Sequence, residues 1–245
     1  MVDIQANIAE VLERIEAAAA RVGRDGREVT LVAVSKTHPP EVIVAAYEAG
    51  LRHFGENRPE EGRDKIPQVL ARLSGPVPTW HMVGHIQSRK ARDVVAFFDV
   101  VHSVDRLKIA RRLSRFAQQS GRTIPILLEC NISGEVTKYG FAVDRWEEDA
   151  LQRNQFLDDV AQILTLPALR VEGLMTMAPI VPDPEMVRPL FRRLRALRDF
   201  LADRFPDASW HHLSMGMTDD FEVAVEEGAT MVRIGRAIFG PRYSL

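Results

Sequence analysis

The first part of the chain carries a helical pattern of apolar residues. They recur at steps of three and four, which places one apolar stripe on a helix that ends at segment 23–26, where a glycine stands at each end. The stripe consists of Ile4, Ile8, Val11, Leu12, Ile15, Ala19 and Val22.

After this helix, short apolar runs alternate with longer amphipathic segments. Several runs are rich in the β-branched residues that strands favour. Eight alternations of strand and helix predict an α/β fold, a single (β/α)8 TIM barrel over residues 1–245. The predicted strands are 30–34, 52–54, 79–83, 99–102, 124–130, 169–174, 209–213 and 230–234. The predicted helices include 39–49, 105–119, 185–205 and 144–164, the last with Asp144 as its N-cap.

The last predicted strand ends at residue 234, which leaves room for only a short helical turn at 236–239. A standard barrel has a full helix after its last strand. We therefore expect the extra N-terminal helix to cover the side of the barrel between the last strand and the first. We expect no second β domain, because no linker and no internal repeat divides the sequence.

Composition narrows the class of protein further. Lys and Arg number 32 and Asp and Glu number 34, so the net charge is −2 and no global field attracts nucleic acid or an anionic membrane. The basic stretch at 89–92 has no interleaved aromatic residues and indicates a solvated helix face. Only one cysteine, Cys130, is present, and the N-terminus has acidic residues where a signal peptide carries positive charge. We expect a cytoplasmic monomer with no nucleic-acid and no membrane partner.

Lys36 directly follows the first predicted strand, in the sequence Ser35-Lys36-Thr37. In parallel barrels the chemistry sits at the carboxyl ends of the strands. Desolvation among apolar walls there lowers the pKa of a lysine from its ordinary value and frees the amine to attack a carbonyl. The alternative interpretation is an ordinary surface lysine.

The next two strand ends offer further polar side chains. Asn57 follows the second predicted strand and either orients a ring hydroxyl or an imine, or caps the next helix. His81 lies within the third strand and His85 just beyond it. A metal pair is one interpretation, but no glutamate stands at metalloprotease spacing, so hydrogen bonding in the core or at the barrel mouth is favoured and no metal is expected.

The last two strand ends predict an anion site. Ser214 follows the seventh predicted strand, and Gly235 and Arg236 follow the eighth and begin the terminal helix. Loops at these two places commonly bind phosphate with backbone amides, to which Ser214 adds a hydroxyl and Arg236 a charge, while Gly235 permits close backbone approach. Arg233 lies two residues before Gly235, so both share one face of the strand. A buried arginine can only donate, and a pyridine nitrogen would accept from it.

An amine for an aldehyde, an anion site and a donor for a ring nitrogen match pyridoxal 5′-phosphate (PLP). The motifs that carry these groups resemble the pyridoxal phosphate homeostasis proteins from near residue 3 to the end. The resemblance implies an alanine-racemase-like barrel. The motifs are LVAVSKTHP, HFGENR, WHMVGHIQSRK, VHSVDR, NISGEVTKYGF, GLMTMAP and LSMGMTDDFEVAVEEGATMVRIGRAIFG.

The resemblance also implies a function in which PLP is held as a lysine aldimine and intracellular PLP is kept in balance. Its implied recipients are PLP-dependent apo-enzymes. The implied PLP-binding residues are Lys36 for the aldimine, Asn57 near the ring, Arg233 facing the pyridine nitrogen, and Ser214, Gly235 and Arg236 at the phosphate.

We expect a carrier or regulator rather than an enzyme, because no second domain supplies a general acid or base for the opposite face of the cofactor. An unprotonated pyridine also withdraws electrons poorly. Two alternatives stay open: a small PLP-dependent amino acid racemase or lyase, and a cofactor-free aldolase that binds a sugar phosphate. Residues Glu135, Lys138 and Tyr139 either close over the ligand or form a plain surface loop.

Overall fold

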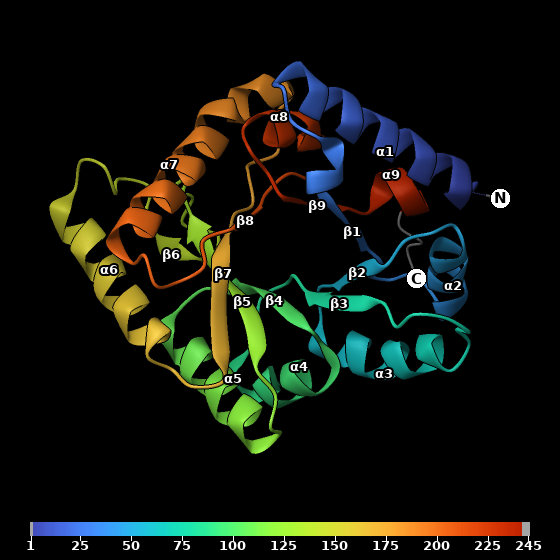
Figure 1. The fold of residues 1–245 in the computed structure, drawn as a ribbon, viewed down its shortest axis with the longest axis horizontal. Helices are drawn as coiled ribbons and strands as arrows, with labels where there is room; N and C mark the ends of the chain where they lie inside the picture. The colour runs from blue at the N-terminus through green and yellow to red at the C-terminus, as the bar shows by residue number, and fades with distance from the viewer. Residues whose placement is uncertain (1, 242–245) are drawn as a thin grey trace.

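The computed structural model describes residues 2–241, and in it a closed ring of parallel strands is surrounded by helices (Figure 1). The strands pair in the order β4-β3-β2-β1-β9-β8-β7-β5, and β4 also pairs with β5, which closes the barrel. All of these pairings are parallel. The predicted (β/α)8 barrel is therefore confirmed.

The barrel strands lie close to the predicted apolar runs, because strands buried on both faces are marked by continuous apolar sequence. A short strand that was not predicted, β6 (Phe141–Ala142), pairs with the end of β5. The barrel strands are β1 (Thr30–Val34), β2 (His53–Glu56), β3 (Thr79–Met82), β4 (Val100–Val104), β5 (Ile124–Asn131), β7 (Leu169–Met175), β8 (His212–Ser214) and β9 (Met231–Ile234).

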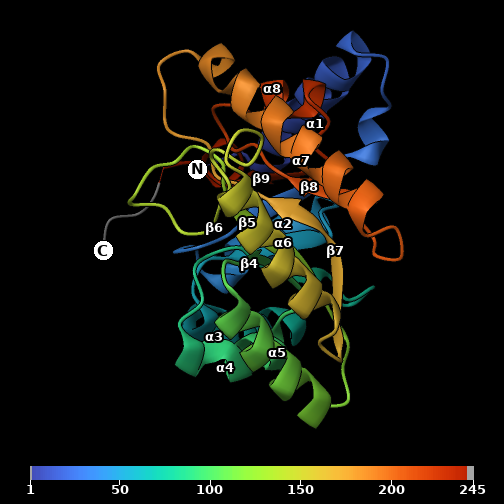
Figure 2. The same ribbon diagram turned by 90° about the vertical axis from the view of Figure 1, so that its left-hand side faces the viewer.

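Helices α1, α7 and α8 lie on one side of the strands and α3, α4 and α5 on the opposite side in both views (Figures 1 and 2). Residues 2–241 also contain three short 3₁₀ helices: η1 (Gly26–Glu28), η2 (Ser88–Lys90) and η3 (Pro184–Val187). The α-helices are α1 (Ile4–Arg21), α2 (Pro40–Glu48), α3 (Pro59–Leu70), α4 (Ala91–Phe97), α5 (Leu107–Gln119), α6 (Ala150–Leu164), α7 (Arg188–Arg204), α8 (Phe221–Glu226) and α9 (Arg236–Phe239).

Helix α6 begins later than its sequence pattern predicted. Its N-cap is Asp149, whose carboxylate accepts hydrogen bonds from the Leu151 and Gln152 amides. The predicted cap, Asp144, instead accepts a hydrogen bond from the Gln152 side chain at 2.9 Å. The prediction was wrong because a second aspartate, closer to the apolar stripe, satisfies the open amides of the first turn.

The N-terminal helix covers the expected side of the barrel. Helix α1 packs against α8, α9 and α2, next to β9 and β1 (Figure 1). The Asn7 side-chain amide donates to the Ile238 carbonyl in α9 at 2.9 Å. Arg24, just after α1, donates to the carbonyl of Val225 in α8 and to that of Ala229 just beyond it. These contacts tie α1 to the elements that follow the last two strands.

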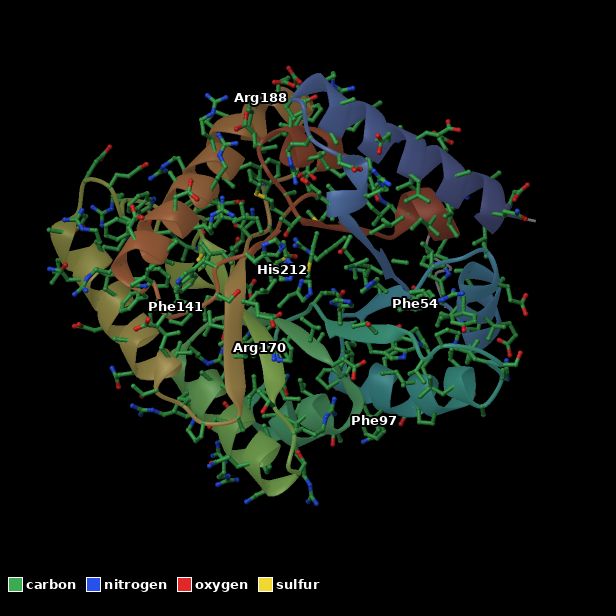
Figure 3. All side chains as sticks on the ribbon, viewed as in Figure 1. Phe54, Phe97, Phe141, Arg170, Arg188 and His212 are labelled. Atoms are coloured by element: carbon green, nitrogen blue, oxygen red, sulfur yellow. The ribbon has the colours of Figure 1, made fainter. Side chains whose placement is uncertain are left out.

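Most buried apolar side chains form one continuous core between the strands and the helices. A small separate cluster consists of Leu127, Met175 and Met231. Several polar side chains of the strands are also buried, among them His81, His102 and Ser214, and the half-buried His212 lies near the middle of the barrel (Figure 3). Within residues 2–241, no helix is both long and apolar enough to span a bilayer.

Candidate functional site

A cavity of about 200 Å³ opens at the carboxyl ends of β1, β2 and β9. Five of the six residues that the sequence singled out line it, together with a threonine from the loop between β8 and α8. These residues are Lys36, Asn57, Arg233, Gly235, Arg236 and Thr218.

The turn that carries Lys36 is held by a buried ion pair. Lys65 Nζ donates to Glu56 at 2.8 Å and to the Ser35 carbonyl at 3.0 Å, and the Ser35 hydroxyl donates to Glu56 at 2.7 Å. The Thr37 backbone is left-handed, with φ +67°, and its amide donates to Glu61 at 2.6 Å. Because these bonds fix the residues on both sides, the half-buried Lys36 is directed at the cavity.

Asn57 lies in the cavity wall and does not cap the next helix. Arg58 is the N-cap residue of α3, and its side chain makes no capping hydrogen bond in the described part of the chain. The capping alternative for Asn57 is therefore wrong, and its amide remains available for a ligand.

Arg233 is buried and has three described hydrogen bonds. Nη1 donates to the Ser214 carbonyl at 2.8 Å and to the Ser214 hydroxyl at 2.6 Å, and Nη2 donates to the Thr176 carbonyl at 2.8 Å. A guanidinium has five N–H groups, so the described bonds leave two for a ligand in the cavity. Burial lowers the pKa of Arg233 to about 10, so it stays protonated at neutral pH and donates only.

The structure places Ser214 beneath the cavity, among buried side chains of the barrel, and not in its wall. Its hydroxyl bonds Arg233 and, at 2.8 Å, the Nδ1 atom of His102. The chain then turns at Gly216, with φ +94°, where a Cβ would lie 2.7 Å from the Ala224 side chain. Thr218, two residues beyond this turn, lines the cavity.

Gly235 and Arg236 line the cavity at the start of α9. A Cβ on Gly235 would lie 3.2 Å from the Val34 carbonyl, so the glycine permits the close passage of β9 beside β1. The Arg236 guanidinium forms an ion pair with Asp219 on the cavity rim. The backbone amides of the first helical turn have no partner inside the helix, so they suit an anion.

A group of polar side chains that sequence reasoning did not connect lies on the other side of the mouth. The Asp105 carboxylate lies 3.0 Å from His85 Nδ1, and His85 stacks on Tyr139 with ring centroids 3.6 Å apart. Lys138 donates to the carbonyl of Met177, a cavity-lining residue, at 3.1 Å. The loop that holds Lys138 and Tyr139 is therefore anchored at the mouth.

Glu129, on β5, is a further buried acid of this region. Burial, aided by the Asp105 charge, raises the pKa of its carboxyl to about 7. Among the residues that the structure describes, its Oε2 atom has no hydrogen-bond partner. In the sequence, the only signal for a role of Glu129 is that its carboxylate stands inside the apolar run of the predicted strand 124–130.

His81 is a buried hydrogen-bonding residue, as favoured from sequence. Its two ring nitrogens bond His53 and His102, at 3.0 and 2.8 Å. Within residues 2–241, no group of three His, Cys, Asp or Glu side chains is arranged to hold a metal ion.

The cavity is thus lined by the Lys36 amine, by the buried Arg233 guanidinium, which has two N–H groups beyond its described hydrogen bonds, and by the backbone amides at the start of α9. This donor set fits a small ligand with a carbonyl group, a neutral ring acceptor and an anionic group. PLP has all three.

Comparison with known proteins identifies the chain's relatives. Residues 6–243 match the family model for the N-terminal domain of alanine racemase. The pyridoxal phosphate homeostasis protein of Escherichia coli strain K12 is 41% identical over 244 residues, 99% of this chain and 98% of that protein. The protein of the same name from Pseudomonas aeruginosa is 43% identical over 244 residues, 99% of this chain and 97% of that protein. The chain belongs to the pyridoxal phosphate homeostasis protein family.

Solved structures agree with this assignment. PipY of Synechococcus elongatus PCC7942, in a structure with PLP bound, superposes with a TM-score of 0.77 at 35% identity, over 94% of this chain and all of that one. An alanine racemase of Clostridium difficile 630 superposes with a TM-score of 0.67 at 14% identity, over 95% of this chain and 60% of the racemase. The second likeness shows the shared barrel fold.

Proposed function

We propose that this protein binds PLP covalently through Lys36 and takes part in intracellular PLP homeostasis. The observation that carries the proposal is the convergence of Lys36 and Arg233 on one cavity. The family supports it, since the relatives are named for PLP homeostasis and PipY has been solved with PLP bound.

Each lining residue has a role in this proposal. PLP supplies an aldehyde that reacts reversibly with amines. Lys36 Nζ would form the covalent bond to it, and Asn57 would lie beside the ring. Arg233 would donate to the pyridine nitrogen and, because the guanidinium keeps its proton, would leave that nitrogen unprotonated.

For the phosphate, the proposed site differs from the sequence prediction in one residue. Thr218, together with the amides of Gly235 and Arg236, would hold the phosphate, since all three residues line the cavity. Ser214 supports Arg233 from beneath, because its hydroxyl and carbonyl both accept from the guanidinium. Since Arg236 is paired with Asp219, its amide contributes more to the site than its side chain.

We propose a carrier or regulator with PLP-dependent apo-enzymes as recipients. An unprotonated pyridine is a weak electron sink, which disfavours turnover of amino acids, whereas storage and delivery need only reversible exchange at Lys36. The chain matches the family model for the N-terminal domain of alanine racemase, so a small racemase or lyase is the second candidate.

Titration of the purified protein with PLP, followed by borohydride reduction and peptide mapping, tests the binding site. We expect visible absorbance of the adduct and a reduced adduct on Lys36. The Lys36→Ala variant should lose both, while Lys108→Ala, a control on the exposed face of α5, should keep both. An adduct on another lysine, or none, would overturn the proposal.

A second experiment separates carrier from enzyme. PLP-loaded protein is mixed with an apo-enzyme in the presence of a trap for free PLP. Activation faster than passive release allows supports delivery. Steady turnover of an amino acid above that of free PLP, lost in Lys36→Ala, would favour the racemase or lyase instead.

A further inference from the structure

A row of hydrogen-bonded side chains crosses the interior of the barrel. It runs from His53 at the start of β2 to Arg233 in the cavity wall, with one member from each of five strands. The bonds are His53 Nδ1 to His81 Nε2 (3.0 Å), His81 Nδ1 to His102 Nε2 (2.8 Å), His102 Nδ1 to Ser214 Oγ (2.8 Å) and Ser214 Oγ to Arg233 Nη1 (2.6 Å).

Arg233 sets the direction of this row. A guanidinium only donates, so the Ser214 oxygen accepts from Arg233 and its own proton points to His102 Nδ1. His102 then carries its proton on Nε2 and donates to His81, which in turn donates from Nε2 to His53. The reverse direction would leave the buried Ser214 proton without an acceptor, which is costly.

The histidines of the row must also be uncharged for the hydrogen bonds to run in this one direction. His81 and His102 are buried, and burial lowers the pKa of His81 to about 3 and that of His102 well below its ordinary value. The charge of Arg233 lowers the His102 value further. Neutral imidazoles have one donor and one acceptor each, which is what a one-directional row requires.

We propose that His102, His81 and His53 are positioning residues for the ligand: they fix the Ser214 hydroxyl and, through it, the orientation of the Arg233 guanidinium at the cavity. The proposal rests on PLP binding in this cavity. With Nη1 held by Ser214 and Nη2 by Thr176, the remaining N–H groups keep one direction toward the ring nitrogen. If the row were broken, the guanidinium would lose one of these supports.

The first test measures the row itself and needs no PLP. Two-bond ¹H–¹⁵N correlation spectra of the histidine-labelled protein report which ring nitrogen carries the proton. At pH 7 we expect the neutral Nε2–H form for His53, His81 and His102. A charged ring, or the Nδ1–H form at His81 or His102, would overturn the proposal.

The second test compares two histidines of the same barrel. His102→Leu removes the link to Ser214. His212→Leu removes a half-buried histidine, labelled in Figure 3, whose described hydrogen bond goes to Thr230 and not to a member of the row. We expect His102→Leu to release PLP at least tenfold faster and to shift the adduct's absorbance, whereas His212→Leu changes neither.

His102→Gln serves as the conservative variant, because its amide has both an acceptor for the Ser214 proton and a donor for His81. We expect it to restore release to within threefold of the original protein. Should His102→Leu fail to fold, His102→Gln and the tautomer spectra decide. Equal effects of the two leucine variants, or an unchanged spectrum and release rate in a folded His102→Leu, would show a merely structural role. Absence of any adduct on Lys36 in the unmodified protein would instead refute PLP binding, whatever the tautomers are.

Discussion

Thr218 and Ser214 carry two nearby hydroxyls to which the structure gives different environments. Thr218 lines the cavity, whereas Ser214 bonds Arg233 and His102 beneath it. We predict that Thr218→Val weakens PLP binding by about 1.5–3 kcal/mol, the value of a hydrogen bond to a charged group. Pyridoxal, which lacks the phosphate, should bind to Thr218→Val and to the original protein equally well. Thr218→Ser keeps the hydroxyl and serves as the control; equal loss for both ligands would remove Thr218 from the phosphate site.

Five of the six residues that the sequence singled out line the cavity, because they lie at or just beyond the ends of parallel strands, which meet at one edge of a barrel. Ser214 was predicted for the phosphate site for the same reason, and Thr218 was not singled out. The turn at Gly216 precedes Thr218 and packs against Ala224, which is a tertiary contact that the sequence pattern does not show. The histidine row could not be predicted from the sequence either. Strand alternation indicates which face of the strand His81 occupies, but not which side chains it contacts.

The buried carboxyl of Glu129 should make the stability of the protein depend on pH. Burial raises the pKa of its carboxyl to about 7, so the folded protein binds this proton more tightly than the unfolded chain. Its contribution to stability is therefore fully present below pH 4.5 and is lost as the pH rises through about 7. Glu129→Gln should match the original protein at pH 4.5 and exceed it at pH 8 by on the order of 3 kcal/mol. Urea unfolding at both pH values measures this, and a constant difference would show that burial of the carboxyl is not its cause.

At the scale of elements, α1 replaces the helix that a standard barrel has after its last strand. Ile15 is 2% exposed on its inner face, whereas Leu12 is 45% exposed. We predict that Ile15→Ala lowers the free energy of unfolding by about 2–5 kcal/mol and that Leu12→Ala changes it by no more than about 0.5 kcal/mol. Removal of residues 1–22 should destabilise the whole barrel. An unchanged melting temperature after that removal would mean that α1 is only an appendage.

The positions of strands and helices could be predicted where the sequence carries one clear hydrophobic pattern. Buried parallel strands are marked by apolar runs, and α1 by a regular stripe that ends near Gly23. The start of α6 was not predictable, because Asp144 and Asp149 both satisfy the capping rule and only packing chooses between them. Strand β6 has two residues and pairs only with β5, which is too little pattern for any period to show.

At the scale of the whole molecule, residues from both ends of the sequence line the cavity. Lys36 and Asn57 come from the first two strands, whereas Arg233 and Gly235 come from the last. We propose that the chain unfolds as one unit, since neither half completes the barrel or the site alone. Tryptophan fluorescence and far-ultraviolet circular dichroism should then give coincident unfolding curves. A ligand that binds only the folded barrel adds about 2.7 kcal/mol at a concentration one hundred times Kd, so PLP should shift both curves together, and much less in Lys36→Ala. Separate transitions, of which PLP moves only one, would show that the chain has two independent folding units.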